Sequence, residues 1–137
     1  MVEHYSDEET IFQIVNDLLE SKDGTHNACE LMLIISDLIL KEEPPVLQAL
    51  IKTEKYIISK WNNYELSPIL KEVTDPLVTT FNHPHANVRK SVVFCLVELY
   101  FAIGDAFESW LEELNPSQQK LVCIYIKRRN DEIVTED

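Results

Sequence analysis

Apolar residues recur every three or four positions along most of this 137-residue chain. The densest pattern runs from Asn87 to Gly104, where one stripe at helical spacing consists of Val88, Val92, Cys95, Leu96, Leu99 and Ile103. Because strands rarely exceed about ten residues, the length of this segment predicts a helix in spite of its many β-branched residues. A second stripe at Val93, Val97 and Tyr100 leaves few polar positions. We therefore expect an inner helix that is covered on more than one side, capped by Asn87 and ended by Gly104.

The same periodicity predicts six further helical segments. Turn and capping residues separate them: a capping box at residues 6–9, a stop at 22–24, prolines at 44–45, and a Ser-Pro start at 67–68. Pro76 lies inside one segment and is expected to kink it. The segments cover about residues 6–22, 27–41, 44–61, 67–81, 107–114 and 115–129. We expect one helical domain over residues 1–130 and an acidic, frayed tail over residues 131–137.

Composition supports an all-α globular domain and indicates the cellular compartment in which it works. Apolar residues make up 45% and charged residues 26% of the chain, and only two glycines occur. The three cysteines, Cys29, Cys95 and Cys123, lie too far apart for a metal knuckle, so we interpret them as structural thiols of a reducing compartment. The sequence shows no signal peptide and no apolar run of membrane-spanning length, which predicts a protein that is neither secreted nor integral to a membrane.

The net charge of −12 argues against nucleic acid or an anionic membrane as a direct partner, because both reward basic patches. The charge is uneven. The first twenty residues hold six acids and neither lysine nor arginine, whereas basic residues gather at Arg89-Lys90 and between Lys120 and Arg129.

An internal repeat links two of the predicted helices. Residues 46, 49, 50, 51, 57 and 58 match residues 88, 91, 92, 93, 99 and 100 at one offset of 42 (88 minus 46). Helix pairs that repeat at roughly 40–47 residues are typical of HEAT-type solenoids. We therefore predict a right-handed HEAT-repeat stack of antiparallel helix pairs with six or seven helices. The first helix then corresponds to the second half of an incomplete pair.

Over residues 65–129 the chain resembles the C-terminal, TOG-like region of the CLASP family, the CLIP-associating microtubule regulators. The resemblance rests on Val88-Arg89-Lys90, on Val93–Val97, on Gly104, on Leu121 with Tyr125–Arg128, and on the helix that contains Pro76. It implies that the chain is the C-terminal part of a longer protein of the cytoplasm and cytoskeleton. Such proteins act at microtubule plus ends, kinetochores, the spindle and the cell cortex during cell division, and their C-terminal domain is associated more with recruiting partners than with gripping tubulin.

No enzyme or cofactor site is predicted. Nothing in the sequence brings a nucleophile, a base and an orienting group together, and no Gly-rich phosphate loop occurs. His83 and His85 flank Pro84, but no further ligand stands near them in the sequence, so we interpret them as solvated loop residues rather than as metal ligands.

Two surfaces are candidate partner-binding sites. In TOG domains the turns inside the repeats meet tubulin, so the resemblance implies contacts from His85, Asn87, Arg89 and Lys90. Against this, Glu42-Glu43 in the preceding turn opposes acidic tubulin, and Arg89 has an alternative role in pairing with an acid of a neighbouring repeat such as Asp75. Phe94 and Phe101 form a second candidate, unless Trp110 and Tyr125 of the final helices cover them.

An oligomer face is a further possibility. If Phe12 and Leu19 stay bare at the end of the stack, the chain dimerises there or docks a partner; if the nearby acids act as a polar cap, it stays monomeric. The predicted function is a non-catalytic docking module that recruits plus-end, kinetochore or cortical adaptors. Direct tubulin binding is one alternative, and a helical adaptor or oligomerisation domain without a microtubule role is another.

Overall fold

The computed structural model describes residues 13, 17, 24–60 and 67–136, and these residues are helical except for short turns. The long helices are α2 (Gly24–Ile39), α3 (Val46–Lys60), α5 (Leu70–Thr80), α6 (Ala86–Ile103) and α8 (Pro116–Glu136). Shorter elements are the 3₁₀ helices η2 (Ser67–Ile69) and η3 (Gly104–Phe107) and the single-turn helix α7 (Glu108–Leu111). The all-α prediction is confirmed. The five long helices fall slightly below the predicted six or seven, because the first predicted helix lies mostly outside the described residues.

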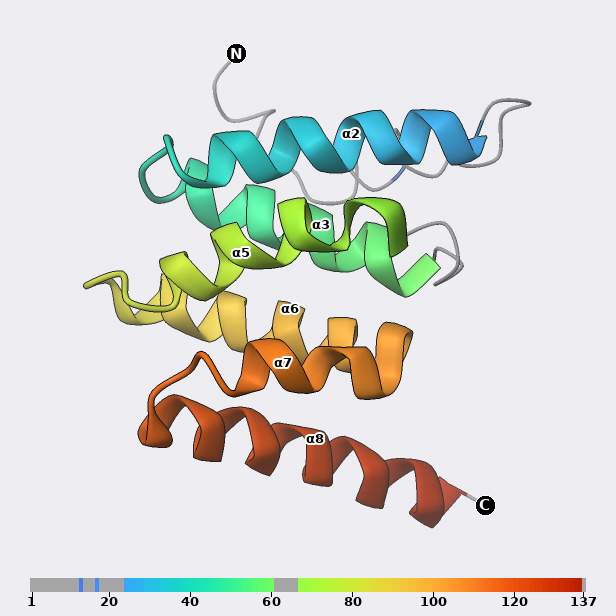
Figure 1. Ribbon diagram of the computed structural model, residues 1–137, viewed down its shortest axis with the longest axis vertical. Helices are drawn as coiled ribbons and strands as arrows, with labels where there is room; N and C mark the ends of the chain where they lie inside the picture. The colour runs from blue at the N-terminus through green and yellow to red at the C-terminus, as the bar shows by residue number, and fades with distance from the viewer. Residues whose placement is uncertain (1–12, 14–16, 18–23, 61–66, 137) are drawn as a thin grey trace.

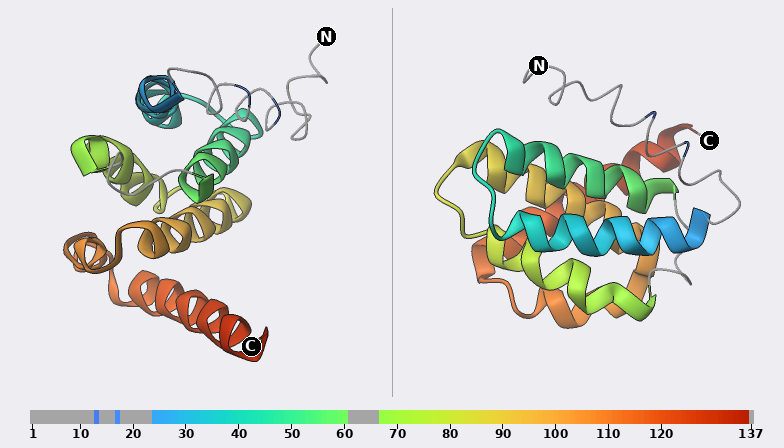
Figure 2. Two further views of the ribbon diagram at one scale, coloured as in Figure 1. Left: turned by 90° about the vertical axis from the view of Figure 1, so that its right-hand side faces the viewer. Right: turned by 90° about the horizontal axis from the view of Figure 1, so that it is seen from above.

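The helices form two layers that run along the long axis of the molecule (Figures 1 and 2). One layer consists of α2, α5 and α7, and the other of α3, α6 and α8 (Figure 2). Within and between the layers, α2 packs on α3 and α5, and α6 packs on α3, α5 and α8. This is the arrangement of a HEAT-like solenoid, in which each repeat supplies one helix to each layer.

Helix α6 is the inner helix that the sequence predicts. Its main stripe is buried except at its end: Val88, Val92, Cys95, Leu96 and Leu99 are each 0% exposed, and Ile103 is half-buried. Gly104 ends the helix at a φ of 62°, in the left-handed region that favours glycine. The predicted cap is wrong by two residues. His85 is the N-cap, and its Nδ1 accepts a hydrogen bond of 3.2 Å from the backbone N–H of Asn87.

The offset of 42 residues relates α3 to α6 in the structure as well as in the sequence. Ile51 and Val93 are buried at matching positions, as are Ile57 and Leu99. One matched pair differs in chemistry, because the fully buried Leu96 of α6 corresponds to Glu54 of α3, which is also 0% exposed. The Oγ of Ser36 in α2 donates to Glu54 Oε2 at 3.2 Å, whereas Oε1 is buried without a hydrogen-bond partner. Burial raises the pKa of Glu54 to about 8, although the bond from Ser36 acts in the opposite direction.

Several helix boundaries differ from the sequence prediction. Gly24 begins α2, where we expected it to end the preceding helix. Helix α8 continues to Glu136 instead of ending at Arg129, so it includes most of the acidic tail. Its start is as predicted, because the backbone N–H of Gln118 donates to Asn115 Oδ1 at 2.8 Å and the Gln118 side chain accepts from the Asn115 N–H. Pro76 lies inside α5, and its predicted kink stays a prediction.

The cysteines occupy three different environments. Cys95 is buried and desolvation raises its pKa, Cys29 is half-buried, and Cys123 is exposed on α8. The interpretation as a buried structural thiol therefore fits Cys95 and does not fit Cys123.

Candidate partner-binding faces

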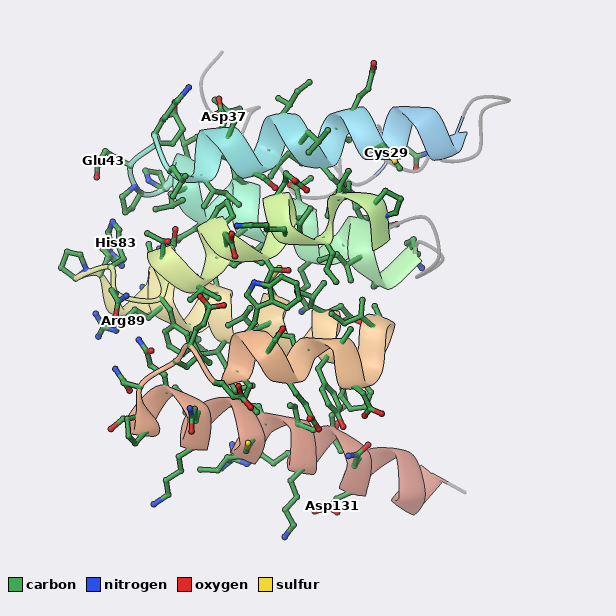
Figure 3. The ribbon with its side chains drawn as sticks, in the orientation of Figure 1. Cys29, Asp37, Glu43, His83, Arg89 and Asp131 are labelled. Atoms are coloured by element: carbon green, nitrogen blue, oxygen red, sulfur yellow. The ribbon has the colours of Figure 1, made fainter. Side chains whose placement is uncertain are left out.

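The turns within the helix pairs gather on one side of the molecule. We call this side the turn edge and define it as residues 40–45, 81–85 and 112–115, which join α2 to α3, α5 to α6 and α7 to α8. Glu43, His83 and Arg89 lie along it in Figure 3. A cavity of about 270 Å³ opens between the first two turns, and its charged lining residues are Lys41, Glu42 and Glu43.

Side chains of the second turn are bound to its own backbone. His83 Nδ1 accepts from the backbone N–H of His85 at 3.0 Å, and His85 in turn caps α6. The guanidinium of Arg89 donates two hydrogen bonds of 2.8 Å, to the carbonyl oxygens of His83 and Pro84. These bonds hold the loop before α6 in one conformation. Arg89 therefore has a structural role, which is one of the two roles that the sequence indicated for it.

The partner expected for Arg89 is wrong, however. Asp75 of α5 instead accepts hydrogen bonds from the side chain of Lys71 and, at 2.8 Å, from Trp110 Nε1. These two donors hold the pKa of Asp75 below its ordinary value. Trp110 therefore ties α7 to α5, and its predicted cover over Phe94 and Phe101 stays a prediction.

The turn edge carries more acid than base in its first and third turns. Glu42 and Glu43 lie in the first turn, and Glu112 and Glu113 in the third. Lys41 Nζ lies 2.8 Å from Asp37 Oδ2, so the carboxylate of Asp37 offsets the positive charge of Lys41. Lys90, just beyond the second turn, is exposed, as are His85 and Asn87.

The second candidate surface lies on α6, facing α8. Phe94 and Phe101 are both half-buried. The ring of Phe94 meets the ring of Tyr125 edge-on, with centroids 5.2 Å apart. The guanidinium of Arg129 lies 4.3 Å from the centroid of Phe101. Helix α8 therefore covers part of each phenylalanine and leaves part of each exposed.

Two adjoining cavities follow this surface. The first, of about 420 Å³, lies between α3 and α6, and the second, of about 360 Å³, lies between α6 and α8. Lys55, Phe94 and Glu98 line both, so the two are continuous. We call them together the outer groove. Its lining residues are Lys52, Lys55, Tyr56, Ser59, Ser91, Phe94, Val97, Glu98, Tyr125, Arg128, Arg129 and Glu132.

Comparison with known proteins identifies the family. Residues 8–122 match the family described as XMAP215/Dis1/CLASP, TOG domain. The chain belongs to this family. The match covers most of the chain and includes both helix layers up to the first part of α8.

Curated relatives of this TOG domain carry CLASP names. A CLIP-associated protein of Arabidopsis thaliana is 36% identical over 95 residues, which is 69% of this chain and 7% of that protein. CLIP-associating protein 1-A of Xenopus laevis is 32% identical over the same share of this chain and 6% of its own length. Protein CLASP-2 of Caenorhabditis elegans is 28% identical over 90% of this chain and 14% of its own length. The chain thus spans a small part of these relatives.

The predicted site residues of the TOG domain divide between its two candidate faces. His85 ends the second turn and Asn87 and Arg89 lie next to it in the first part of α6, whereas Phe94 and Phe101 border α8. Lys90 connects the two, since its Nζ lies 5.8 Å from the centroid of Phe94. Phe12 and Leu19 fall outside the described residues, so the dimerisation face stays a prediction.

Sequence reasoning missed the basic residues of the outer groove, chiefly Lys55, Arg128 and Arg129. The clustering of bases between Lys120 and Arg129 was visible, but the cavity that Arg128 and Arg129 line together with Lys55 of α3 was not. Within the described residues, no group of three or more His, Cys, Asp or Glu side chains is placed to hold a metal ion. The described helices of this TOG domain also include none with the length and apolar character that crossing a membrane requires.

Proposed function

We propose that the chain is a non-catalytic docking module of a CLASP-like microtubule-associated protein. In this role it binds adaptor proteins that place the longer protein at microtubule plus ends, at kinetochores and the spindle, or at the cell cortex. Membership of the TOG family and the CLASP names of the relatives support a microtubule setting in the cytoplasm. The solenoid offers long, rigid faces and suits binding rather than catalysis.

The observation that carries the proposal is the chemistry of the turn edge. A surface that binds acidic tubulin should present basic side chains there. Instead, Glu42 and Glu43 occupy the first turn and Glu112 and Glu113 the third. The guanidinium of Arg89, beside the second turn, donates hydrogen bonds to two carbonyl groups of its own chain. The side of the domain that would meet tubulin is therefore poorly suited to it.

Direct tubulin binding is the second candidate function. It is favoured by the family itself and by the exposed Lys90 next to the second turn. A single lysine has to outweigh four nearby carboxylates for this function, and surface charges interact weakly at physiological salt. We therefore rank it below adaptor docking.

Cosedimentation with microtubules at low salt tests the choice. We expect no half-saturation at low micromolar tubulin, a range that corresponds to roughly 8 kcal/mol of binding free energy. The double variant Glu42→Lys/Glu43→Lys removes the acids of the first turn and should bind more strongly than the native chain. Glu72→Lys/Glu108→Lys, the same double charge reversal at exposed positions of α5 and α7 outside the turn edge and the outer groove, is the matched control and should leave cosedimentation unchanged. Half-saturation of the native chain at low micromolar tubulin would refute the proposal.

A further inference from the structure

The outer groove faces away from the first helix layer. None of the described residues that line its two cavities belongs to α2, α5 or α7; all come from α3, α6 and α8. These three helices lie one above another as a single layer (Figure 2). The groove therefore follows the outside of that layer, on a different side of the domain from the turn edge.

Aromatic rings and cations alternate along the groove. Phe94 stands at its centre, with its ring edge-on to Tyr125. Lys55 Nζ lies 5.6 Å from the Phe94 centroid, and the guanidinium of Arg128 lies 5.1 Å from the Tyr125 centroid. Cations at these distances are attracted to the ring faces, so they are held beside the apolar surface and not dispersed into solvent.

The acids of the groove are too few to cancel these cations. Glu98 receives two hydrogen bonds from Arg129, at 3.1 and 3.2 Å, which neutralise its charge. Glu132 is the other lining acid, against the cations Lys55 and Arg128. Partly buried bidentate pairs of this kind are fixed in geometry, so Glu98 offers little repulsion to an incoming anion.

This local excess of positive charge contrasts with the charge of the rest of the molecule. Of the twelve lysines and arginines of the chain, nine lie on α3, α6 and α8, whereas only five of its twenty-four acids do. The remainder of the chain accounts for the whole net charge of −12 and more. A long polyanion such as nucleic acid would extend beyond the groove into this negative field and be repelled. A short anionic segment would not.

We propose that the outer groove binds an acidic peptide segment that inserts one bulky apolar side chain against Phe94 and Tyr125. Carboxylates on either side of this anchor pair with Lys55 and Arg128. The cavity of about 360 Å³ that Phe94 and Tyr125 both line is large enough for an aromatic or leucine side chain. The inference rests on the proposed docking function and names the chemistry of the docked partner.

A synthetic probe tests this directly. The probe is a fluorescein-labelled peptide of about twelve residues, long enough to span roughly 40 Å when extended, with a central tryptophan among glutamates and serines. Two control peptides replace the glutamates by lysines or the tryptophan by serine. We expect fluorescence anisotropy to give at least about tenfold tighter binding for the probe than for either control, with the difference reduced by raising the salt concentration.

Matched variants of the chain locate the site. Lys55→Glu/Arg128→Glu should weaken probe binding by about tenfold or more, whereas Lys41→Glu/Lys71→Glu, the same charge change on α2, α5 and their turns, should weaken it less than about threefold. Urea unfolding establishes that both variants fold. In ¹⁵N spectra of the native chain, amides of α3, α6 and α8 around Phe94 should shift on titration with the probe.

Four results would overturn the inference. The first three are equal affinity for the acidic and basic peptides, equal loss in the two double variants, and shifts confined to the turn edge. A fourth is probe binding that improves when Glu8 and Glu9 are changed to lysine, because the groove would then be filled by the chain's own acidic segment. Tight tubulin cosedimentation together with groove binding of the probe would refute the proposed function and leave the groove assignment in place.

Discussion

Replacing Glu54 should make the domain more stable at neutral pH. This carboxyl is fully buried in α3, one of its oxygens has no hydrogen-bond partner, and its pKa is raised to about 8 from an ordinary value of 4.5. The folded domain therefore holds a proton that the unfolded chain releases. Stability from this group is fully present below pH 4.5 and is lost as the pH rises to about 8.

The magnitude follows from these two values. Each pH unit between the unfolded and folded pKa changes the free energy of unfolding by about 1.4 kcal/mol. Across the full window the loss is at most about 5 kcal/mol, and between pH 5 and pH 7.5 it is about 3 kcal/mol. That is a large part of the total stability of a domain, which is roughly 5–15 kcal/mol. Glu54→Leu, which copies the matching Leu96 of α6, also removes the unpaired oxygen.

The assay is urea unfolding at several pH values between 5 and 8. Glu54→Gln is the matched variant, because it keeps the shape and the hydrogen bond to Ser36 but does not titrate. The difference in free energy of unfolding between native chain and variant should change by about 3 kcal/mol over this range in favour of the variant at high pH. Glu43→Gln, at an exposed position, should give a difference of less than about 0.5 kcal/mol at every pH. A flat difference for Glu54→Gln would refute the burial of this carboxyl.

Two further predictions concern α6. Leu96→Ala should lower the free energy of unfolding by about 2–5 kcal/mol, because it opens a cavity in the core. The control Ile124→Ala, on the exposed side of α8, should lower it by less than about 1 kcal/mol. A small effect of Leu96→Ala in urea melts would show that α6 is not the inner helix. His85→Ala should cost about 1 kcal/mol by removing the helix cap, whereas His85→Asp should retain most of the stability. Equal melts of the two His85 variants would rule out capping by this side chain.

Local patterns predicted most of the fold. The full apolar circumference of α6 indicated an inner helix, and the offset of 42 residues indicated how α3 and α6 correspond. Glu54 was not predicted as a core residue, because a single carboxylate in an amphipathic pattern is typical of the solvent face. His85 was missed as a cap because imidazole is a rare capping group compared with the amide of the neighbouring Asn87.

The candidate site was harder to predict than the fold. Phe94 and Tyr125 were named from the sequence, and their contact is confirmed. The outer groove also needs Lys55, which lies far from both in the chain and meets Phe94 only once α3 packs on α6. Periodicity assigns each residue to a face of its own helix, but it does not give the partner helix or the rotation between them. Cation–aromatic contacts across three helices therefore follow from packing and not from local sequence.

The most direct test compares two charge reversals in cells. The protein that carries this chain is expressed as a fluorescent fusion, either native, with Lys55→Glu/Arg128→Glu in the outer groove, or with Lys41→Glu/Lys71→Glu on the other layer. If docking of an adaptor through the outer groove is the function, the groove variant loses its enrichment at spindle and plus-end microtubules, and the other variant keeps it at equal expression. Retained enrichment of the groove variant, with loss in the other, would contradict docking through this surface.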